Sequence, residues 1–436
     1  MLRRRLHEGL NSVVGCVVSV LSLEIMSKAA GTHGNSKVHA SQNFVLLLVI
    51  VFFTTFASSM VSGSAVIFLV KSLAVTMEAT TALIGVLVAV SSVAMIAGNF
   101  LGGFLADRAG RKMTITVASV ILVPSLFVYS IVPSVFLVVL VYFVHMFAMS
   151  MFQPALTAFV ADLSRLSSRG KAFGRFNLFW LGSTVPGPLV GGFLVDSVGL
   201  RFPFMIGSLI AILGLAGSLG LVGIAGARAS EGESSEVDGA KKVLMPLGRV
   251  LLFFGAIGFL SGLANGLLGP LIRDFPIYRL GADATQLGLV FSLGSGLATT
   301  LVQVPGGKLA DKFGRKPLML VSLLGAPFVI GLAFTGSVLG FTAVSAGLVA
   351  FGNLAAPAYQ AWLMELVSSG RRAKVWGFVN AVTGAGQFFG PFISTWLWAT
   401  QTWVAVPFIV AAVPWILQIP PILKLKETKT DTTRSV

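Results

Sequence analysis

The chain has 436 residues, of which 55% are apolar and only 11% are charged. Soluble domains carry roughly 25% charged residues and lack repeated apolar runs of about 20 residues, so a soluble fold is excluded. The formal charge of +15 does not indicate a nucleic-acid partner, because the basic residues form no stripe and lie in short clusters between apolar runs. The single cysteine, Cys16, excludes a disulfide framework and a multi-cysteine metal site, and we expect neither a metal nor a cofactor.

The first 42 residues precede any run that is long enough to span a bilayer. Arg3 to Arg5 stand before a short apolar stretch, Val13 to Leu23, which has the character of a signal core but is too short to cross. We expect residues 1–42 to be a mobile cytoplasmic tail or the product of an upstream start, with Met26 as the alternative initiator. The alternative is an organellar targeting segment, although the two acidic residues within residues 1–42 count against it.

Twelve apolar runs follow, each of a length suited to a helix that crosses about 30 Å of hydrocarbon. The first six are predicted at 44–70, 82–106, 114–131, 135–161, 173–195 and 203–224. The second six are predicted at 250–272, 285–309, 317–335, 338–364, 376–398 and 404–423. The sequence therefore predicts an all-α membrane protein of twelve transmembrane helices.

The most hydrophilic interior stretch lies between the sixth and seventh runs, and it divides the chain into two halves. We expect a six-helix bundle over 43–224, a cytoplasmic linker over 225–249, a second six-helix bundle over 250–423 and a cytoplasmic tail over 424–436.

The distribution of Lys and Arg predicts the orientation, since these residues are kept on the cytoplasmic side of a membrane. If both termini are cytoplasmic, only four of the 31 basic residues fall outside, namely Lys71, Arg201, Arg273 and Arg279. A missed helix would scatter basic loops over both faces. The count thus favours a multi-pass protein with both termini in the cytoplasm, and it leaves open which membrane, an organellar one included.

The two halves contain an internal repeat. Residues 103–112 read Gly-Phe-Leu-Ala-Asp-Arg-Ala-Gly-Arg-Lys, and residues 307–316, offset by 204, read Gly-Lys-Leu-Ala-Asp-Lys-Phe-Gly-Arg-Lys. Further pairs at an offset of 203 include Pro154 with Pro357, Asp162 with Glu365, and Gly187-Pro188 with Gly390-Pro391. A duplicated six-helix unit explains both sets, and such an architecture places a solute site at the midplane between the halves.

Each repeated loop has a physical interpretation. Its glycines allow close approach of helices, and Asp107 or Asp311 can face the N-terminus of a neighbouring helix, where the macrodipole favours an anion. Such a contact would hold one conformation and release in another. The alternative is that the charges only anchor the loops at the membrane surface.

Both loops resemble the signature loop of the major facilitator superfamily, Gly-x-Leu-Ala-Asp-Arg-x-Gly-Arg-Lys, and the resemblance covers about residues 43 to 423. It implies two pseudo-symmetric six-helix bundles, alternating access, function as a monomer and a cytoplasmic gate that stabilises the outward-open state without touching the solute. The gate residues so implied are Gly103, Asp107, Arg108, Gly110, Arg111, Gly307, Asp311, Gly314 and Arg315.

A second, partial resemblance is to the drug and proton antiporters of this superfamily. The fifth run contains Pro186-Gly187-Pro188-Leu-Val-Gly-Gly, similar to their Gly-Pro-x-x-Gly-Gly element, and Gly390-Pro391 stands at the matching place in the eleventh. Glycine allows tight packing and proline loosens a helix, so we expect these residues to flex their helices or simply to pack. Tyr142 stands where that branch has an arginine, which leaves proton coupling open.

By these boundaries no Asp, Glu, Lys or Arg lies near a helix midpoint, so the central cavity is expected to be nearly neutral. Five other residues lie near the midplane and are the candidates for lining the cavity: His145, Trp180, Asn265, Asn353 and Gln387. An imidazole has an unperturbed pKa near 6.5, which suits proton exchange. A buried histidine satisfied by hydroxyls, and amides that join helices, are the alternatives.

The function that these features favour is secondary transport of a small organic solute through the lipid bilayer, driven by a gradient such as protons or by the solute alone. The chain has no Walker-type loop, so direct use of ATP is not expected. Clustered catalytic groups are also missing from the predicted spans, so we do not expect an enzyme. The alternative is a receptor or membrane chaperone that has a transporter fold but does not translocate.

Overall fold

The computed structural model describes residues 35–74, 76–164, 169–221, 246–367, 372–400 and 403–425. The expectations for residues 1–34, for 222–245 within the linker and for the tail from residue 426 fall outside this part. The described residues are almost entirely helical, and eleven of their helical segments are long and apolar enough to cross a membrane. The remaining predicted span, the eleventh at 376–398, corresponds to a helix of 29 residues, α17 (Arg372–Thr400), which is long enough but is more polar, with Asn380, Gln387 and several glycines.

The first half contains α2 (Asn35–Met60), the π-helical turn η1 (Val61–Ala65), α3 (Val66–Leu73), α4 (Met77–Arg108), α5 (Arg111–Val128), α6 (Val135–Leu163), α7 (Arg169–Thr184), α8 (Gly187–Ser197) and α9 (Phe202–Gly220). The second half contains α10 (Leu247–Arg279), α11 (Ala284–Leu289), the π-helical turn η3 (Val290–Leu297), α12 (Ala298–Phe313), α13 (Arg315–Ser322), α14 (Gly325–Leu332), α15 (Val338–Leu354), α16 (Ala356–Leu366), α17, α18 (Ala405–Leu417) and α19 (Ile419–Lys424).

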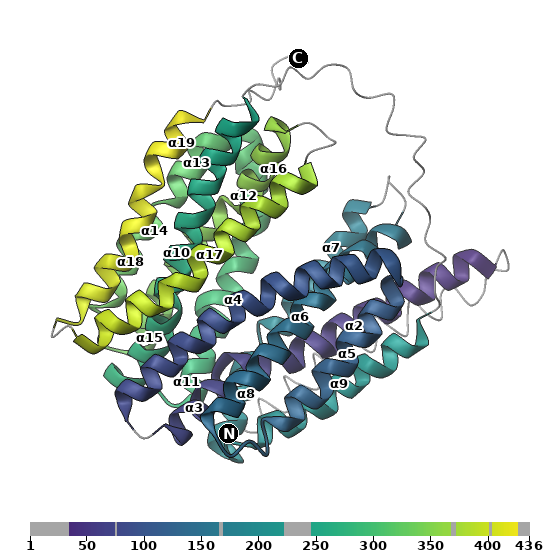
Figure 1. The fold of residues 1–436 in the computed structure, drawn as a ribbon, viewed down its shortest axis with the longest axis horizontal. Coiled ribbons are helices and arrows are strands. Elements are labelled where there is room, and N and C mark those ends of the chain that lie inside the picture. Colours follow the sequence, from purple (N-terminus) through teal and green to yellow (C-terminus); the bar gives the residue numbers. More distant parts are fainter. Residues whose placement is uncertain are drawn as a thin grey trace.

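The two halves form two separate helix bundles, drawn in purple to teal and in green to yellow (Figure 1). The bundles meet where α4 crosses α17 and where α8 lies beside α11. The predicted spans match the helices within a few residues, with one correction that concerns function. The seventh span was expected to end at residue 272, but α10 continues to Arg279 and so takes Arg273 and Asp274 into the helix.

The repeat in the sequence is also a repeat in space. Gly110 and Gly314 have positive φ angles of 92° and 96°, which glycine adopts without strain, and they begin α5 and α13. The ammonium of Lys112 donates to the carbonyl of Leu219 at 3.2 Å, and that of Lys316 donates to Leu423 at 2.6 Å. Both cations thus lie at the C-terminal end of the last helix of their own half, where the helix dipole favours them.

The same duplication governs the tightest helix contacts. A Cβ atom on Gly102 would clash with the carbonyl of Met151, and one on Gly306 would clash with the carbonyl of Leu354. Each half therefore brings its second and fourth membrane helices into backbone contact through one glycine, as small residues do in membrane bundles.

Candidate transport site

The two ends of the molecule differ in how the halves meet. We call the motif end the one that carries the loops at Gly110 and Gly314, and the opposite end the one that carries Asp196 and Tyr278. At the opposite end the carboxylate of Asp196 in α8 accepts hydrogen bonds from the backbone N–H of Thr285 at 2.7 Å, from its hydroxyl at 2.6 Å and from the N–H of Ala284 at 3.3 Å. A carboxylate of one half thus caps the first turn of α11 in the other half.

Further contacts close the opposite end. The N–H of Leu189 donates to the hydroxyl of Ser292 at 3.1 Å, and the ammonium of Lys71 lies 5.7 Å from the centre of the Tyr278 ring. A small apolar cluster draws on both halves and consists of Ile67, Ile84, Ile277 and Leu287. The ribbons of the two bundles diverge toward the motif end, where α7 and α16 lie (Figure 1). The structure therefore represents a state that is closed at the opposite end.

The first loop motif makes its contacts within its own half. The Nε atom of Arg111 lies 2.8 Å from the carboxylate of Asp162 and so ties the start of α5 to the end of α6. Asp107 and Arg108 are exposed, and the guanidinium of Arg108 lies over the ring of Phe104 at 4.5 Å. A carboxylate-to-helix contact of the kind predicted for Asp107 is present at the opposite end, at Asp196, which the sequence analysis did not single out.

The second loop motif is more enclosed. Arg315, at the start of α13, is only 8% exposed, whereas the space beside Gly307 is open, as it is beside Gly103. The side chain of Asp311 lies outside the described part of the structure. The gate role of both motifs concerns the conformation in which the motif end is closed, so it stays a prediction.

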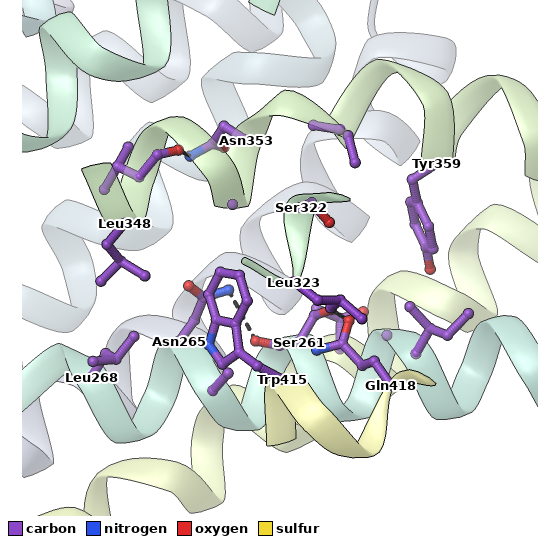
Figure 2. Close-up of a pocket in the computed structure, with 18 of the residues that line it drawn as sticks. Ser261, Asn265, Leu268, Ser322, Leu323, Leu348, Asn353, Tyr359, Trp415 and Gln418 are labelled. Carbon is purple, nitrogen blue, oxygen red and sulfur yellow. Dashed lines mark hydrogen bonds between the residues drawn. The ribbon is translucent and has the colours of Figure 1, made fainter. Parts of the chain in front are cut away.

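A cavity of about 360 Å³ lies inside the second half (Figure 2). Its polar lining consists of Ser261, Asn265, Ser322, Asn353, Tyr359, Asn380, Thr383, Trp415 and Gln418. Leu268, Leu323 and Leu348 are among its apolar residues. None of the described residues that line it is Asp, Glu, Lys or Arg, so this lining offers hydrogen bonds and apolar surface but no fixed charge.

The amides in this cavity are oriented by their own helices. The side-chain NH₂ groups of Asn265 and Asn353 each donate to the carbonyl four residues earlier, at 3.0 and 3.1 Å. This leaves the amide oxygen of each, and the second N–H, for a bound molecule. The hydroxyl of Ser261 donates to Oε1 of Gln418 at 3.0 Å, and the hydroxyl of Tyr359 donates to the carbonyl of Phe254 at 3.3 Å.

Two of the five predicted lining residues, Asn265 and Asn353, line this cavity together. His145 is fully buried in the first half, where its Nε2 is 2.8 Å from the hydroxyl of Ser58 and its ring is flanked by two tyrosines. Trp180 is half-buried and packs against Phe176. Gln387 lies on α17, where its backbone packs against glycines of α10.

The sequence analysis missed Ser261, Tyr359, Trp415 and Gln418. Ser261 had a usable signal, since it lies four residues before Asn265 and therefore on the same face of a helix. Trp415 and Gln418 belong to the last membrane helix, and no sequence pattern places that helix beside α10.

The proline and glycine elements of the two halves differ in structure. In the first half the helix is interrupted, since α7 ends at Thr184 and α8 begins at Gly187, with Pro186 between them. Gly187 and Gly191 there approach the backbone of α2 closely. In the second half Gly390 and Pro391 lie within the unbroken α17, packed against α10. Flexing of either helix remains a prediction.

Two helix bundles of common origin, closed against each other at one end and holding a neutral cavity, define a membrane transporter. The family model of the Major Facilitator Superfamily matches residues 47–256 and 254–435, and the chain belongs to this family. It is a secondary transporter and an integral, multi-pass membrane protein.

Relatives in sequence and in structure agree with this assignment. The chain is 25% identical to Multidrug resistance protein 2 of Bacillus subtilis over 360 residues, 80% of this chain and 87% of that one. It is also 25% identical to the Proton-coupled antiporter flippase LtaA of Staphylococcus aureus over 363 residues, 80% of this chain and 86% of that one. Its fold resembles a D-xylose-proton symporter, with a TM-score of 0.67, 18% identity and coverage of 88% of this chain and 97% of that one. It also resembles the nucleoside transporter NupG, with a TM-score of 0.66, 16% identity and coverage of 86% and 99%.

Proposed function

We propose that this transporter carries a small, uncharged, amphipathic organic solute and binds it in the cavity of the second half. The observation that carries the proposal is the described lining of that cavity, in which the amides of Asn265 and Asn353 stand among leucines and no residue is charged. A charged solute would lose its hydration there without gaining a counter-charge, whereas a neutral solute with one or two hydrogen-bonding groups would not.

The positive-inside distribution supports an orientation in which the motif end faces the cytoplasm. The closed opposite end is then the outer end, and the structure corresponds to an inward-facing state. Alternating access would follow when the two bundles, predicted over 43–224 and 250–423, rock as units about the contacts of α4 with α17 and of α8 with α11. The protein would function as a monomer.

Proton-coupled antiport is the transport mode that we favour. Its support is the naming of two relatives, one as a multidrug resistance protein and one as a proton-coupled antiporter flippase. The part of the cavity lining that the structure describes contains no Asp, Glu or His, so a proton would have to bind elsewhere in the protein.

Transport assays in proteoliposomes test this proposal. The panel would contain neutral amphiphiles matched in size to organic cations and organic anions, each measured with and without a pH gradient. We expect movement of neutral compounds only, dependent on the gradient, and a loss of about tenfold in Asn353→Leu and Asn265→Leu, the effect of one lost hydrogen bond to a buried group. Gly336→Ala, beside open space and outside both loop motifs and the cavity, is the control for expression and insertion.

Two results would refute the proposal. Transport of the charged compounds alone would contradict a neutral cargo, and unchanged transport by both asparagine variants would place the solute elsewhere. Transport of the neutral compounds at the same rate with and without the pH gradient would rule out proton coupling and indicate a facilitator.

A further inference from the structure

Asp274 is the one acidic side chain that is buried among the described residues. It lies in α10, two residues beyond the predicted end of the seventh span, and none of its surface is exposed. Neither of its carboxyl oxygens has a hydrogen-bond partner in the described part of the protein. Carboxyl groups are rarely buried in this way, so this residue needs a physical explanation.

The neighbours of Asp274 do not supply a counter-charge at contact distance. Arg273 turns away along its own helix, where it donates to the carbonyl of Gly269 at 2.6 Å and lies over the ring of Phe291 at 5.2 Å. Thr81 of α4 lies beside the carboxyl, but its hydroxyl makes no hydrogen bond of good geometry in this state.

Other ionisable groups near this carboxyl lie on several elements. Tyr278 follows on α10, and Lys71 of α3 lies over the Tyr278 ring. Tyr142 of α6 is near enough to interact electrostatically with Arg273. Glu78 and Asp283, at the starts of α4 and α11, are exposed, and neither α18 nor the adjoining end of α17 brings an ionisable residue.

An ionised carboxylate in such a site is withdrawn from bulk solvent without a hydrogen bond or a contacting counter-charge, which is unfavourable, whereas a carboxylic acid is neutral and can donate to a nearby oxygen. The closed outer end therefore accepts Asp274 in its protonated form. The hydroxyl of Thr81 is the neighbouring oxygen that is free to take this hydrogen bond.

The burial of Asp274 depends on the contact between the two halves. The carboxyl belongs to the second half, and Thr81 belongs to the first. The apolar cluster beside it joins Ile67 and Ile84 of the first half to Ile277 and Leu287 of the second. Separation of the halves at the outer end would take α3 and α4 away from α10 and admit water to the carboxyl.

We propose that Asp274 is a proton-binding site whose occupancy is coupled to the outer gate: the proton binds as the outer end closes and leaves when that end opens. This rests on the proposed function, since it assumes alternating access with the motif end in the cytoplasm. By linkage, a proton bound preferentially in the closed state makes acid favour closure and alkali favour opening.

The position of Asp274 also links the proton to the cargo. Gly269 and Ile272, which line the cavity, lie on the same stretch of α10 as Asp274. The carbonyl of Gly269 also accepts a hydrogen bond from the guanidinium of Arg273. A solute in the cavity and a proton on Asp274 are therefore separated by about two helical turns of one rigid element.

The test measures the outer gate directly and needs no solute. In a Cys16→Ser background, spin labels are placed at Ile131 of the first half and Phe334 of the second, which are 59% and 67% exposed at the outer end. Their separation is measured by pulsed electron resonance in lipid nanodiscs between about pH 5 and about pH 9. The variants are Asp274→Asn, Asp274→Glu and the control Asp283→Asn, which alters an exposed carboxylate at the same end and keeps a good helix cap.

We expect the wild-type ratio of open to closed forms to rise with pH, by at most about tenfold per pH unit for one proton. Asp274→Asn, neutral at every pH, should stay closed throughout, while Asp274→Glu and Asp283→Asn should keep the response. A wild-type distance that ignores pH, or an Asp274→Asn protein that responds as the wild type does, overturns the proposal. If the gate responds as expected but no neutral solute is transported, only the proposed cargo is wrong.

Discussion

The two halves share a backbone plan but differ in what fills their centres. At the repeat offset of 203, Ser58 corresponds to Ser261 and His145 corresponds to Leu348. In the first half Ser58 meets the imidazole of His145, and the two tyrosines beside it complete a filled core. In the second half Ser261 turns to Gln418, and Leu348 lies at the wall of an open cavity. Duplication preserved the scaffold, and a few side chains decided which half holds a cavity.

The largest effect should come from breaking the scaffold that the halves share. Gly102→Ala and Gly306→Ala each place a methyl against a backbone carbonyl that cannot move freely, which costs about 1 to 3 kcal/mol of stability. Thermal unfolding in detergent measures the loss. Gly103→Ala and Gly307→Ala, one residue along in open space, are the matched controls, and equal unfolding temperatures for both pairs would contradict this packing.

The second test gives the half that holds the cavity the histidine of its counterpart. Leu348→His should place an imidazole within reach of Ser261, reduce the cavity and lower transport about tenfold, the scale of a steric change in a binding pocket. The reverse change, His145→Leu, leaves Ser58 without its partner and should lower stability by about 1 to 3 kcal/mol with transport changed less than threefold. If the His145→Leu protein is folded but loses more transport than this, the result would instead support a role for His145 in solute binding or in proton exchange.

The contact between the halves at the end opposite the loop motifs should give a smaller effect. Asp196→Asn keeps an acceptor but removes the negative charge at the first turn of α11, so the closed population should fall about threefold, the scale of a charge at a helix terminus. Distances between spin labels placed across that end measure the change. Asp283→Asn alters the cap of the same helix within one half, and an equal shift there would show that the effect belongs to α11 and not to the contact.

The smallest effect should come from the symmetric lysines. Lys112→Met and Lys316→Met remove a cation from the C-terminal end of the last helix of each half, which costs about 0.3 to 1 kcal/mol. The unfolding temperatures of the two variants should differ little from each other. Clearly unequal losses of stability in the two variants would mean that the two equivalent lysines no longer contribute equally to the stability of their halves.

Much of the architecture could be predicted from local patterns. Apolar runs gave the helices within a few residues, because a bilayer demands about twenty apolar residues per crossing, and the two similar loops gave the duplication. The end of the seventh span was wrong, since Arg273 and Asp274 are charged and hydropathy stops at them. The protein tolerates Asp274 inside α10 because the other half covers it, which is a property of the contact and not of the segment.

The sequence by itself determined that the chain lies in a membrane, where its helices are, that its halves are duplicated and which family it resembles. Each of these follows from composition, periodicity or a short motif. Only the tertiary structure decided which polar residues share a cavity. Asn265 and Asn353 meet there with Ser261 and Gln418, while the equally deep His145 is enclosed in the other bundle. It also decided that Asp196 caps a helix of the opposite half, a contact that no sequence motif indicated. Depth in a membrane can be counted along a chain, but which helix faces which depends on side-chain packing between segments far apart in sequence.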